Sequence, residues 1–212
     1  MTVGTLAHVV SVTDPDAIPL AQRVLREGGL VVFPTDTVYG VGAAVDCPQA
    51  VARLYTVKGR PLDRPIPVLV SSIDQVERLA AGVDERVKRL LATFWPGALT
   101  VVVPAQEWLP EEIVRQTGTV GLRMPDHPVA LAIIEAAGGA LATTSANRSG
   151  EREACTAEEA RDALGDRVEL ILDGGRSPGG RPSTVVAVKD GELRVLRAGP
   201  VDPELIRRVL TG

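Results

Sequence analysis

The amino-acid sequence predicts one α/β domain built on a twisted, mixed sheet, and three observations support this prediction. First, β-branched apolar runs alternate along the chain with segments whose apolar residues recur at helical spacing. Second, two β-prone runs flank Asp190-Gly191 near the end of the chain, which indicates a hairpin and therefore antiparallel pairing within the sheet. Third, no repeat and no linker of disordered composition interrupts the 212 residues, so we expect one domain over 1–212.

The first half of the chain alternates predicted strands with predicted helices. Pro34 ends the second strand, and we expect a loop rich in hydroxyl groups and glycines from there to Cys47. Trp95-Pro96-Gly97 ends the fourth helix. The strands are predicted at Leu6–Val12, Leu30–Phe33, Ile66–Val70 and Leu99–Val103. The helices are predicted from Asp14–Asp16 to Gly28-Gly29, and over Pro48–Lys58, Ile73–Ala80 and Val83–Phe94.

The second half continues the alternation and then closes with the hairpin and a last helix. Thr156 followed by Glu159 is a capping box, which predicts the start of one helix. The predicted helices are His127–Ala137, Thr156–Leu164 and Pro203–Leu210. The predicted strands are Val120–Met124, Leu141–Thr144, Val168–Leu172, Val185–Val188 and Leu193–Leu196.

Composition excludes several classes of protein. A net charge of −4 argues against a surface coated with basic residues for non-specific nucleic-acid binding, although one local basic cleft is compatible with it. Aromatic residues make up only 3%, so base stacking is not expected as the main binding mode. Cys47 and Cys155 lack metal or redox spacing and are expected to fill space in the core. Without a secretion signal or an apolar run of ~18 residues, a cytoplasmic protein with no membrane contact is expected.

Four polar loops, each following an apolar run or a helix, combine small residues with hydroxyl groups, glycine or arginine. Any one of them also fits an ordinary turn or helix end, but together they indicate one pocket for an anionic nucleotide. They are PTDTVYG (34–40), KGRPLDR (58–64), TSANRSG (144–150) and GGRSPGGRPST (174–184). The composition of the fourth loop suggests a mobile lid. His8 and His127 lie outside these loops, with His127 expected at a helix start, so a Ser-His-Asp hydrolase is not expected.

Seven motifs, in this order, closely resemble those of the YrdC-like family of threonylcarbamoyl-AMP synthases. They are PTDTVYGVGA, Lys58-Gly59-Arg60, FWPGALT, VGLRMP, TSANRSG, the P-S-T of Pro182–Thr184 and LRAG. The resemblance covers roughly residues 15 to 200 and implies the YrdC/RibB-like fold, with helices flanking the sheet and a concave, positively charged face. It also implies L-threonylcarbamoyladenylate synthase activity. That reaction converts L-threonine, bicarbonate and ATP into threonylcarbamoyl-AMP and pyrophosphate, for the threonylcarbamoyl-adenosine of tRNA.

The resemblance also implies roles for individual residues. Lys58 and Arg60 would be catalytic, because displacement of pyrophosphate by a carbamate oxygen needs charge neutralisation and alignment rather than a nucleophile. The residues implied in ATP binding are Lys58, Arg60, Arg64, Thr100, Ser145, Asn147, Ser149 and Arg197. Those implied in threonine binding are Thr37, Arg123, Thr143 and Ser183. Mg²⁺ would be bound through the ATP phosphates, since the chain has no dedicated acidic cage.

Two positions depart from the pattern of many family members, and two alternative functions remain open. Arg64 and Leu69 stand where many members have asparagine and histidine; Arg64 could still reach phosphate, whereas Leu69 cannot replace an imidazole. The chain resembles the minimal single-domain members, which leaves partner proteins in tRNA modification undefined. One alternative is a paralogue without the synthase activity. The other is a non-catalytic protein binding double-stranded RNA or tRNA, with a basic patch extended by Arg148, Arg152, Arg176 and Arg181.

Overall fold

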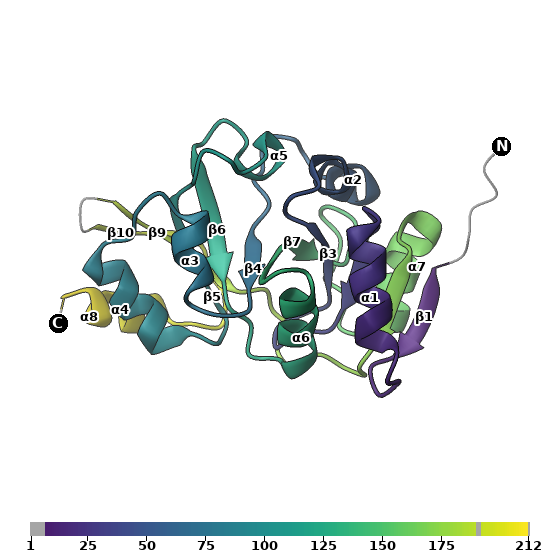
Figure 1. Cartoon of the computed structure of the whole chain (residues 1–212). Coiled ribbons are helices and arrows are strands. Elements are labelled where there is room, and N and C mark those ends of the chain that lie inside the picture. The colour runs from purple at the N-terminus through teal and green to yellow at the C-terminus, as the bar shows by residue number, and fades with distance from the viewer. Residues whose placement is uncertain (1–6, 190–191, 212) are drawn as a thin grey trace.

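Ten strands pair into one mixed sheet in the computed structural model, which describes residues 7–189 and 192–211 (Figure 1). Their order across the sheet is β1-β8-β2-β3-β7-β4-β6-β5-β9-β10. The strands are β1 (His8–Ser11), β2 (Val31–Phe33), β3 (Gly40–Ala44), β4 (Val68–Val70), β5 (Leu99–Pro104), β6 (Thr119–Arg123), β7 (Ala140–Ser145), β8 (Leu170–Asp173), β9 (Thr184–Lys189) and β10 (Glu192–Arg197). Parallel pairs (β1 with β8, β8 with β2, β4 with β6, β5 with β9) lie among antiparallel ones, which confirms the mixed sheet.

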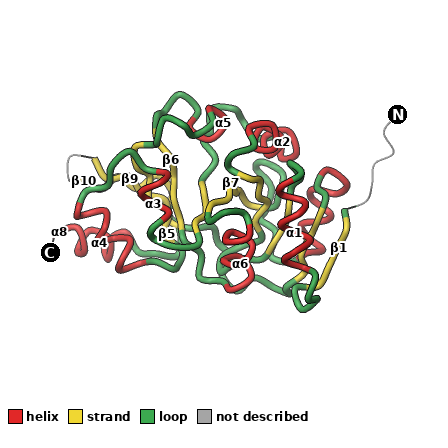
Figure 2. The backbone as a smooth tube through the Cα atoms, in the orientation of Figure 1, coloured by secondary structure: helices red, strands yellow, loops and turns green. Residues whose placement is uncertain are grey.

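Helices cover both faces of this sheet (Figures 1 and 2). They are α1 (Ala17–Arg26), α2 (Pro48–Lys58), α3 (Gln75–Leu79), α4 (Glu85–Phe94), α5 (Glu111–Val114), α6 (Pro128–Ala136), α7 (Ala157–Leu164) and α8 (Pro203–Thr211), with a 3-10 turn η1 at Gly165–Arg167. Successive residues of β2 point to opposite faces, as the pleat of a strand requires. Val31 and Phe33 join the core beneath α1 and α6, and Val32 joins the core that includes α2 and α7.

The segment from Pro34 to Cys47 is not the continuous loop predicted from the sequence, because it contains β3. Its sequence is glycine-rich, and glycine weakens a strand in isolation. Neighbouring side chains explain the glycines: a Cβ on Gly42 would lie 2.6 Å from Leu141 Cδ2, and one on Gly40 would lie 3.0 Å from Thr143 Cγ2. Pairing on both sides, with β2 and β7, therefore stabilises a strand that local propensity does not favour.

Most other elements were predicted, with ends displaced by a few residues. The short helix α5 was not predicted. β9 and β10 pair antiparallel as expected, while the predicted turn at Asp190-Gly191 lies outside the described residues, as does Leu6. The N-cap residue of α6 is His127, and the Oγ1 of Thr156 accepts the Glu159 N–H at 3.2 Å, as predicted.

Two expectations from composition can also be compared with the described residues. Cys155 is buried and Cys47 is half-buried, and both are free thiols, which agrees with their expected role in filling space. Within residues 7–189 and 192–211, no helix combines the length and apolarity that a membrane crossing requires.

Candidate active site

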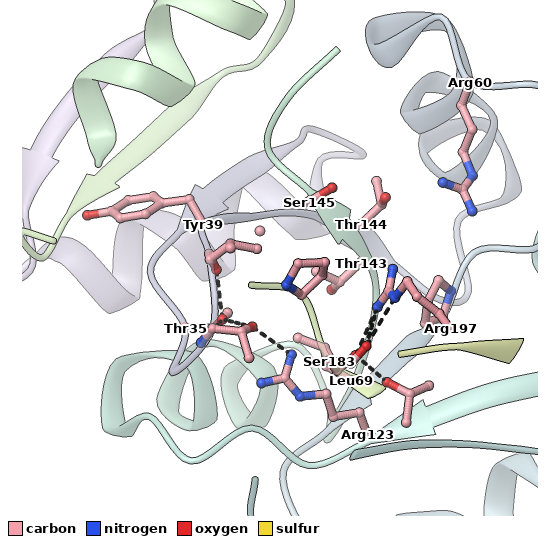
Figure 3. Close-up of a pocket in the computed structure, with 16 residues that line it drawn as sticks. Thr35, Tyr39, Arg60, Leu69, Arg123, Thr143, Thr144, Ser145, Ser183 and Arg197 are labelled. Carbon is pink, nitrogen blue, oxygen red and sulfur yellow. Dashed lines mark hydrogen bonds between the residues drawn. The ribbon is translucent and has the colours of Figure 1, made fainter. Parts of the chain in front are cut away.

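The four polar loops predicted to form one site do meet, in a pocket near the middle of the sheet (Figure 3). Each loop contributes side chains to its lining: PTDTVYG contributes Thr37, KGRPLDR Arg60, TSANRSG Ser145 and GGRSPGGRPST Ser183. The pairing of β3 with β7 explains part of this convergence, because Gly40 lies opposite Ser145 and brings the first and third loops side by side. The prediction of one shared pocket is confirmed in its geometry.

Arg123, at the end of β6, is the most deeply buried cation of the pocket. Its Nη2 donates to Asp36 Oδ1 at 2.6 Å, its Nη1 donates to Thr37 Oγ1 at 3.0 Å, and its Nε donates to the carbonyl oxygen of Gly97 at 2.9 Å. Burial lowers the pKa of Arg123, and the neighbouring Asp36 carboxylate opposes that effect. A guanidinium group has five N–H donors, so two remain for an anionic ligand.

A second cluster joins Thr100 of β5, Ser183 and Arg197 at another wall of the pocket. The hydroxyl groups of Thr100 and Ser183 lie 2.8 Å apart, and Arg197 Nη2 donates to Ser183 Oγ at 3.1 Å. Arg197 as a whole is exposed, but partial burial of its guanidinium group lowers its pKa. The positive charges of Arg123 and Arg60 lower this pKa further, whereas the carboxylate of Glu153 raises it. Positive charges close enough to lower the pKa of Arg197 also favour the binding of an anion beside it.

Arg60 follows the C-terminus of α2 and also lines the pocket. Gly59 ends the helix in the left-handed conformation, with φ of 60°, and so turns the chain toward the site. Arg60 Nε donates to the carbonyl oxygen of Arg64 at 3.1 Å, and its Nη2 donates to that of Pro65 at 2.8 Å. Burial is the main cause that lowers the pKa of Arg60. These bonds orient the guanidinium group before any ligand arrives.

Lys58, which was expected beside the phosphates, is buried and does not line the pocket. Its Nζ donates to the carbonyl oxygen of Ser145, to that of Asn147 at 2.7 Å and to Asn147 Oδ1 at 2.9 Å. Burial lowers the pKa of Lys58 to about 7, with a further lowering by Arg60, whereas three oxygen acceptors favour the ammonium form. In this structure Lys58 holds the TSANRSG loop in place.

Three other residues assigned to ATP lie outside the pocket lining. Asn147 closes its own loop, because Ser145 Oγ donates to its Oδ1 at 2.6 Å and its Nδ2 donates to the Glu151 carbonyl oxygen at 2.8 Å. Ser149 donates its backbone N–H to the Lys58 carbonyl oxygen at 2.8 Å. Arg64 is exposed, and it is its carbonyl oxygen that contacts Arg60.

Leu69 does line the pocket, and its register partner in β6 is Arg123. Its side chain is 5% exposed and belongs to the core beneath α1 and α6. Thr143, which was assigned to threonine binding, also lines the pocket from β7. Leu69, one of the two positions where this chain departs from many family members, therefore lies within the site and provides an apolar part of its wall.

Four residues near the site were not singled out from the sequence, although three of them lie in the PTDTVYG motif. Thr35, Tyr39 and Thr144 line the pocket, and Asp36 pairs with Arg123. Thr35 Oγ1 donates to the Val38 carbonyl oxygen at 2.7 Å and lies 3.0 Å from Thr37 Oγ1. The signal available for Asp36 in the sequence was its place beside Thr37 in the PTDTVYG motif. Its partner Arg123 is far away in the sequence, so the pairing that a buried charge requires is visible only in the fold.

The mixed sheet makes this an α/β protein, and the cations and hydroxyl groups of its pocket are the donor groups that suit an anion. The model of the Sua5/YciO/YrdC family, described as "Telomere recombination", matches residues 23–199, and the chain belongs to this family.

Three similar proteins define the likeness further. A threonylcarbamoyl-AMP synthase of Bacillus subtilis (strain 168) is 41% identical over 202 residues, which cover 95% of this chain and 58% of that protein. A putative threonylcarbamoyl-AMP synthase of Mycobacterium tuberculosis is 44% identical over 193 residues, which cover 90% of this chain and 87% of that protein. The crystal structure of P. abyssi Sua5 complexed with L-threonine has a TM-score of 0.91 and 37% identity, over 97% of this chain and 61% of that one.

Proposed function

We propose that this chain is an L-threonylcarbamoyladenylate synthase, which converts L-threonine, bicarbonate and ATP into threonylcarbamoyl-AMP and pyrophosphate. The observation that carries the proposal is the meeting of three guanidinium groups, those of Arg60, Arg123 and Arg197, with several hydroxyl groups in one pocket. Similar proteins that bear this activity in their names support it, as does the threonine-bound relative. The chain spans 58% and 87% of the first two relatives, so the activity is proposed for the part that they share.

Threonine would be held on the side of Arg123. Two unused N–H groups of that guanidinium suit a carboxylate, and the adjacent Thr37 hydroxyl is already ordered by Arg123 and Thr35. Thr143 and Ser183 line the same pocket. The apolar side chain of Leu69 offers a surface for the substrate's methyl group rather than a hydrogen bond.

ATP would be held on the side of Arg60, Ser145, Thr100 and Arg197. The amino group of threonine condenses with bicarbonate to a carbamate and releases water. An oxygen of this carbamate then attacks the α-phosphorus of ATP, and pyrophosphate leaves with the electrons of the broken P–O bond. Arg60 is oriented for charge stabilisation in this step. Lys58 would act on the same step by fixing the loop that carries Ser145.

Mg²⁺ would enter with ATP and neutralise charge on its phosphates. In the part of the chain that the structure describes, no group of three or more His, Cys, Asp or Glu side chains could hold a metal ion. The donor set therefore suits a metal held by the nucleotide. The product would then serve the threonylcarbamoyl-adenosine modification of tRNA in the cytoplasm, and direct contact with tRNA or with partner proteins belongs to the same proposal.

The deciding experiment incubates the protein with ATP, Mg²⁺, bicarbonate and labelled threonine. We expect pyrophosphate and a threonine-containing adenylate in equal amounts, both dependent on bicarbonate. A protein that consumes no ATP, or that uses serine as well as threonine, would contradict the proposed activity or its substrate. Salt-sensitive binding of double-stranded RNA that threonine does not affect, with no ATP consumed, would favour the non-catalytic alternative.

A further inference from the structure

Tyr39 connects three segments that are far apart in the sequence. Its backbone N–H donates to the Ala154 carbonyl oxygen, and its own carbonyl oxygen accepts the Ala146 N–H, both at 2.8 Å. Its hydroxyl group donates to the Gly175 carbonyl oxygen at 2.6 Å and accepts the Gly174 N–H at 3.2 Å. The side chain is 0% exposed, and burial raises the pKa of Tyr39, so the hydroxyl group keeps the proton that it donates.

The segment held by this hydroxyl group is the glycine-rich loop, residues 174–183, which leads from β8 to Ser183 at the pocket. The loop lies directly on the Thr37 backbone. Gly180 donates its N–H to the Thr37 carbonyl oxygen at 2.9 Å, and a Cβ on Gly179 would lie 2.8 Å from Thr37 Cα. Thr37 and Ser183, both on the proposed threonine side, therefore depend on where this loop lies.

Three contacts fix the glycine-rich loop along its length: those of Gly180, the Ser177 N–H to the Cys155 carbonyl oxygen at 2.8 Å, and the pair made by Tyr39. The first two join backbone to backbone. Other side chains outside the loop contact it as well: Asp173 Oδ1 accepts the Gly175 N–H at 2.9 Å, and Thr100 and Arg197 contact Ser183 at the pocket. Tyr39 differs from them because it is neither next to the loop in sequence nor one of the residues proposed to bind ATP, so its hydroxyl group can be removed without altering either. The ring points away from the labelled arginines of the pocket, so its hydroxyl group is aimed at the loop rather than at their ligand (Figure 3).

We propose that Tyr39 is a positioning residue for the threonine side of the site: its hydroxyl group latches the glycine-rich loop, and the loop places Thr37 and Ser183. The inference rests on the proposed function and adds to it a residue that no substrate needs to touch. The expected mobile lid would then be fixed at its first two residues, Gly174 and Gly175, by the Tyr39 hydroxyl group. Threonine binding and the latch should reinforce each other, since coupling between two sites is reciprocal.

The test compares Tyr39→Phe with wild type by amide hydrogen exchange and by steady-state kinetics. Loss of the hydroxyl group leaves the Gly175 carbonyl oxygen and the Gly174 N–H without this partner. We expect exchange in residues 174–183 to accelerate roughly tenfold and the KM for threonine to rise roughly tenfold, with smaller changes in kcat and in the KM for ATP.

Tyr55→Phe is the matched control, because Tyr55 is the other tyrosine of the chain and is also buried. Its hydroxyl group donates to the Glu112 carbonyl oxygen at 2.7 Å and lies 3.1 Å from the Arg64 carbonyl oxygen, with which it can share the same proton. The same loss of one hydroxyl group should leave exchange in the glycine-rich loop and the KM for threonine unchanged. Any kinetic effect should fall on ATP, because the Arg64 carbonyl oxygen also accepts from Arg60.

Unchanged exchange in Tyr39→Phe, or faster exchange with a wild-type KM for threonine, would overturn the latch. Hydrogen exchange needs no turnover, so it decides the latch even if the wild-type protein makes no adenylate and the proposed function fails. If the variant does not fold, fluorotyrosine-labelled wild type provides the second measurement. Threonine should shift the ¹⁹F resonance of Tyr39, assigned with the help of Tyr55→Phe, and an unshifted resonance overturns the proposal.

Discussion

Replacing Arg60 by alanine tests the part of the mechanism on which the proposed chemistry depends most. The guanidinium group is held by the carbonyl oxygens of Arg64 and Pro65, so it stabilises developing charge without reorganising. Loss of one such preorganised donor commonly costs about 10²–10³ in rate. Coulomb's law for unit charges ~4 Å apart at an effective dielectric constant of ~20 gives about 4 kcal/mol, close to 10³. We therefore expect kcat to fall by roughly 10²- to 10³-fold.

The matched control is Arg64→Ala, which removes the same charge four residues away. Its side chain is exposed and does not line the pocket, and the carbonyl oxygen that orients Arg60 is retained. A stopped assay for pyrophosphate, with both variants saturated in ATP and threonine, separates the two positions. If Arg60→Ala stays within about threefold of wild type, or if Arg64→Ala falls equally far, the assignment of charge stabilisation to Arg60 is refuted.

Three further predictions concern the support of the site. The pKa of Lys58 lies at about 7, below its value of 10.5 in the unfolded chain, so above pH 7 the folded protein loses the ammonium that holds the TSANRSG loop and activity should decline. Between pH 7 and 10.5 the unfolded chain binds the extra proton, so the contribution of Lys58 to the free energy of unfolding should rise. A fall in thermal stability parallel to the fall in activity would contradict this. Asp36→Ala leaves Arg123 buried without its partner, so the free energy of unfolding should fall by about 3–5 kcal/mol in a denaturant titration, with part recovered in Asp36→Asn. Gly179→Ala places a Cβ 2.7 Å from the Asp36 carbonyl oxygen, and calorimetry should show threonine affinity at least tenfold weaker; wild-type affinity would disprove the close packing of the loop on Thr37.

Elements with strong periodicity could be predicted from the sequence, and those that depend on their neighbours could not. The apolar stripe of α4 and the capping box of α7 are local signals, so both helices were predicted. β3 was missed because its glycines reduce local strand propensity, while the space that they leave is filled by Leu141 and Thr143 from the adjacent strand. α5, at Glu111–Val114, is too short for a periodic pattern to emerge.

The sequence by itself determined which four loops carry the polar groups of the site, because glycines, hydroxyl groups and arginines that follow apolar runs can be recognised from local sequence alone. Only the tertiary structure decided the direction of each side chain. Lys58 and Arg60 are two residues apart on the chain, yet Lys58 is turned into the TSANRSG loop, whereas Arg60 lines the pocket. The physical reason is that the partners of Lys58, the carbonyl oxygens of Ser145 and Asn147, belong to a distant segment that reaches α2 only in the folded sheet. Arg60 is instead held by carbonyl oxygens four and five residues further along the chain, which leaves its guanidinium group at the pocket.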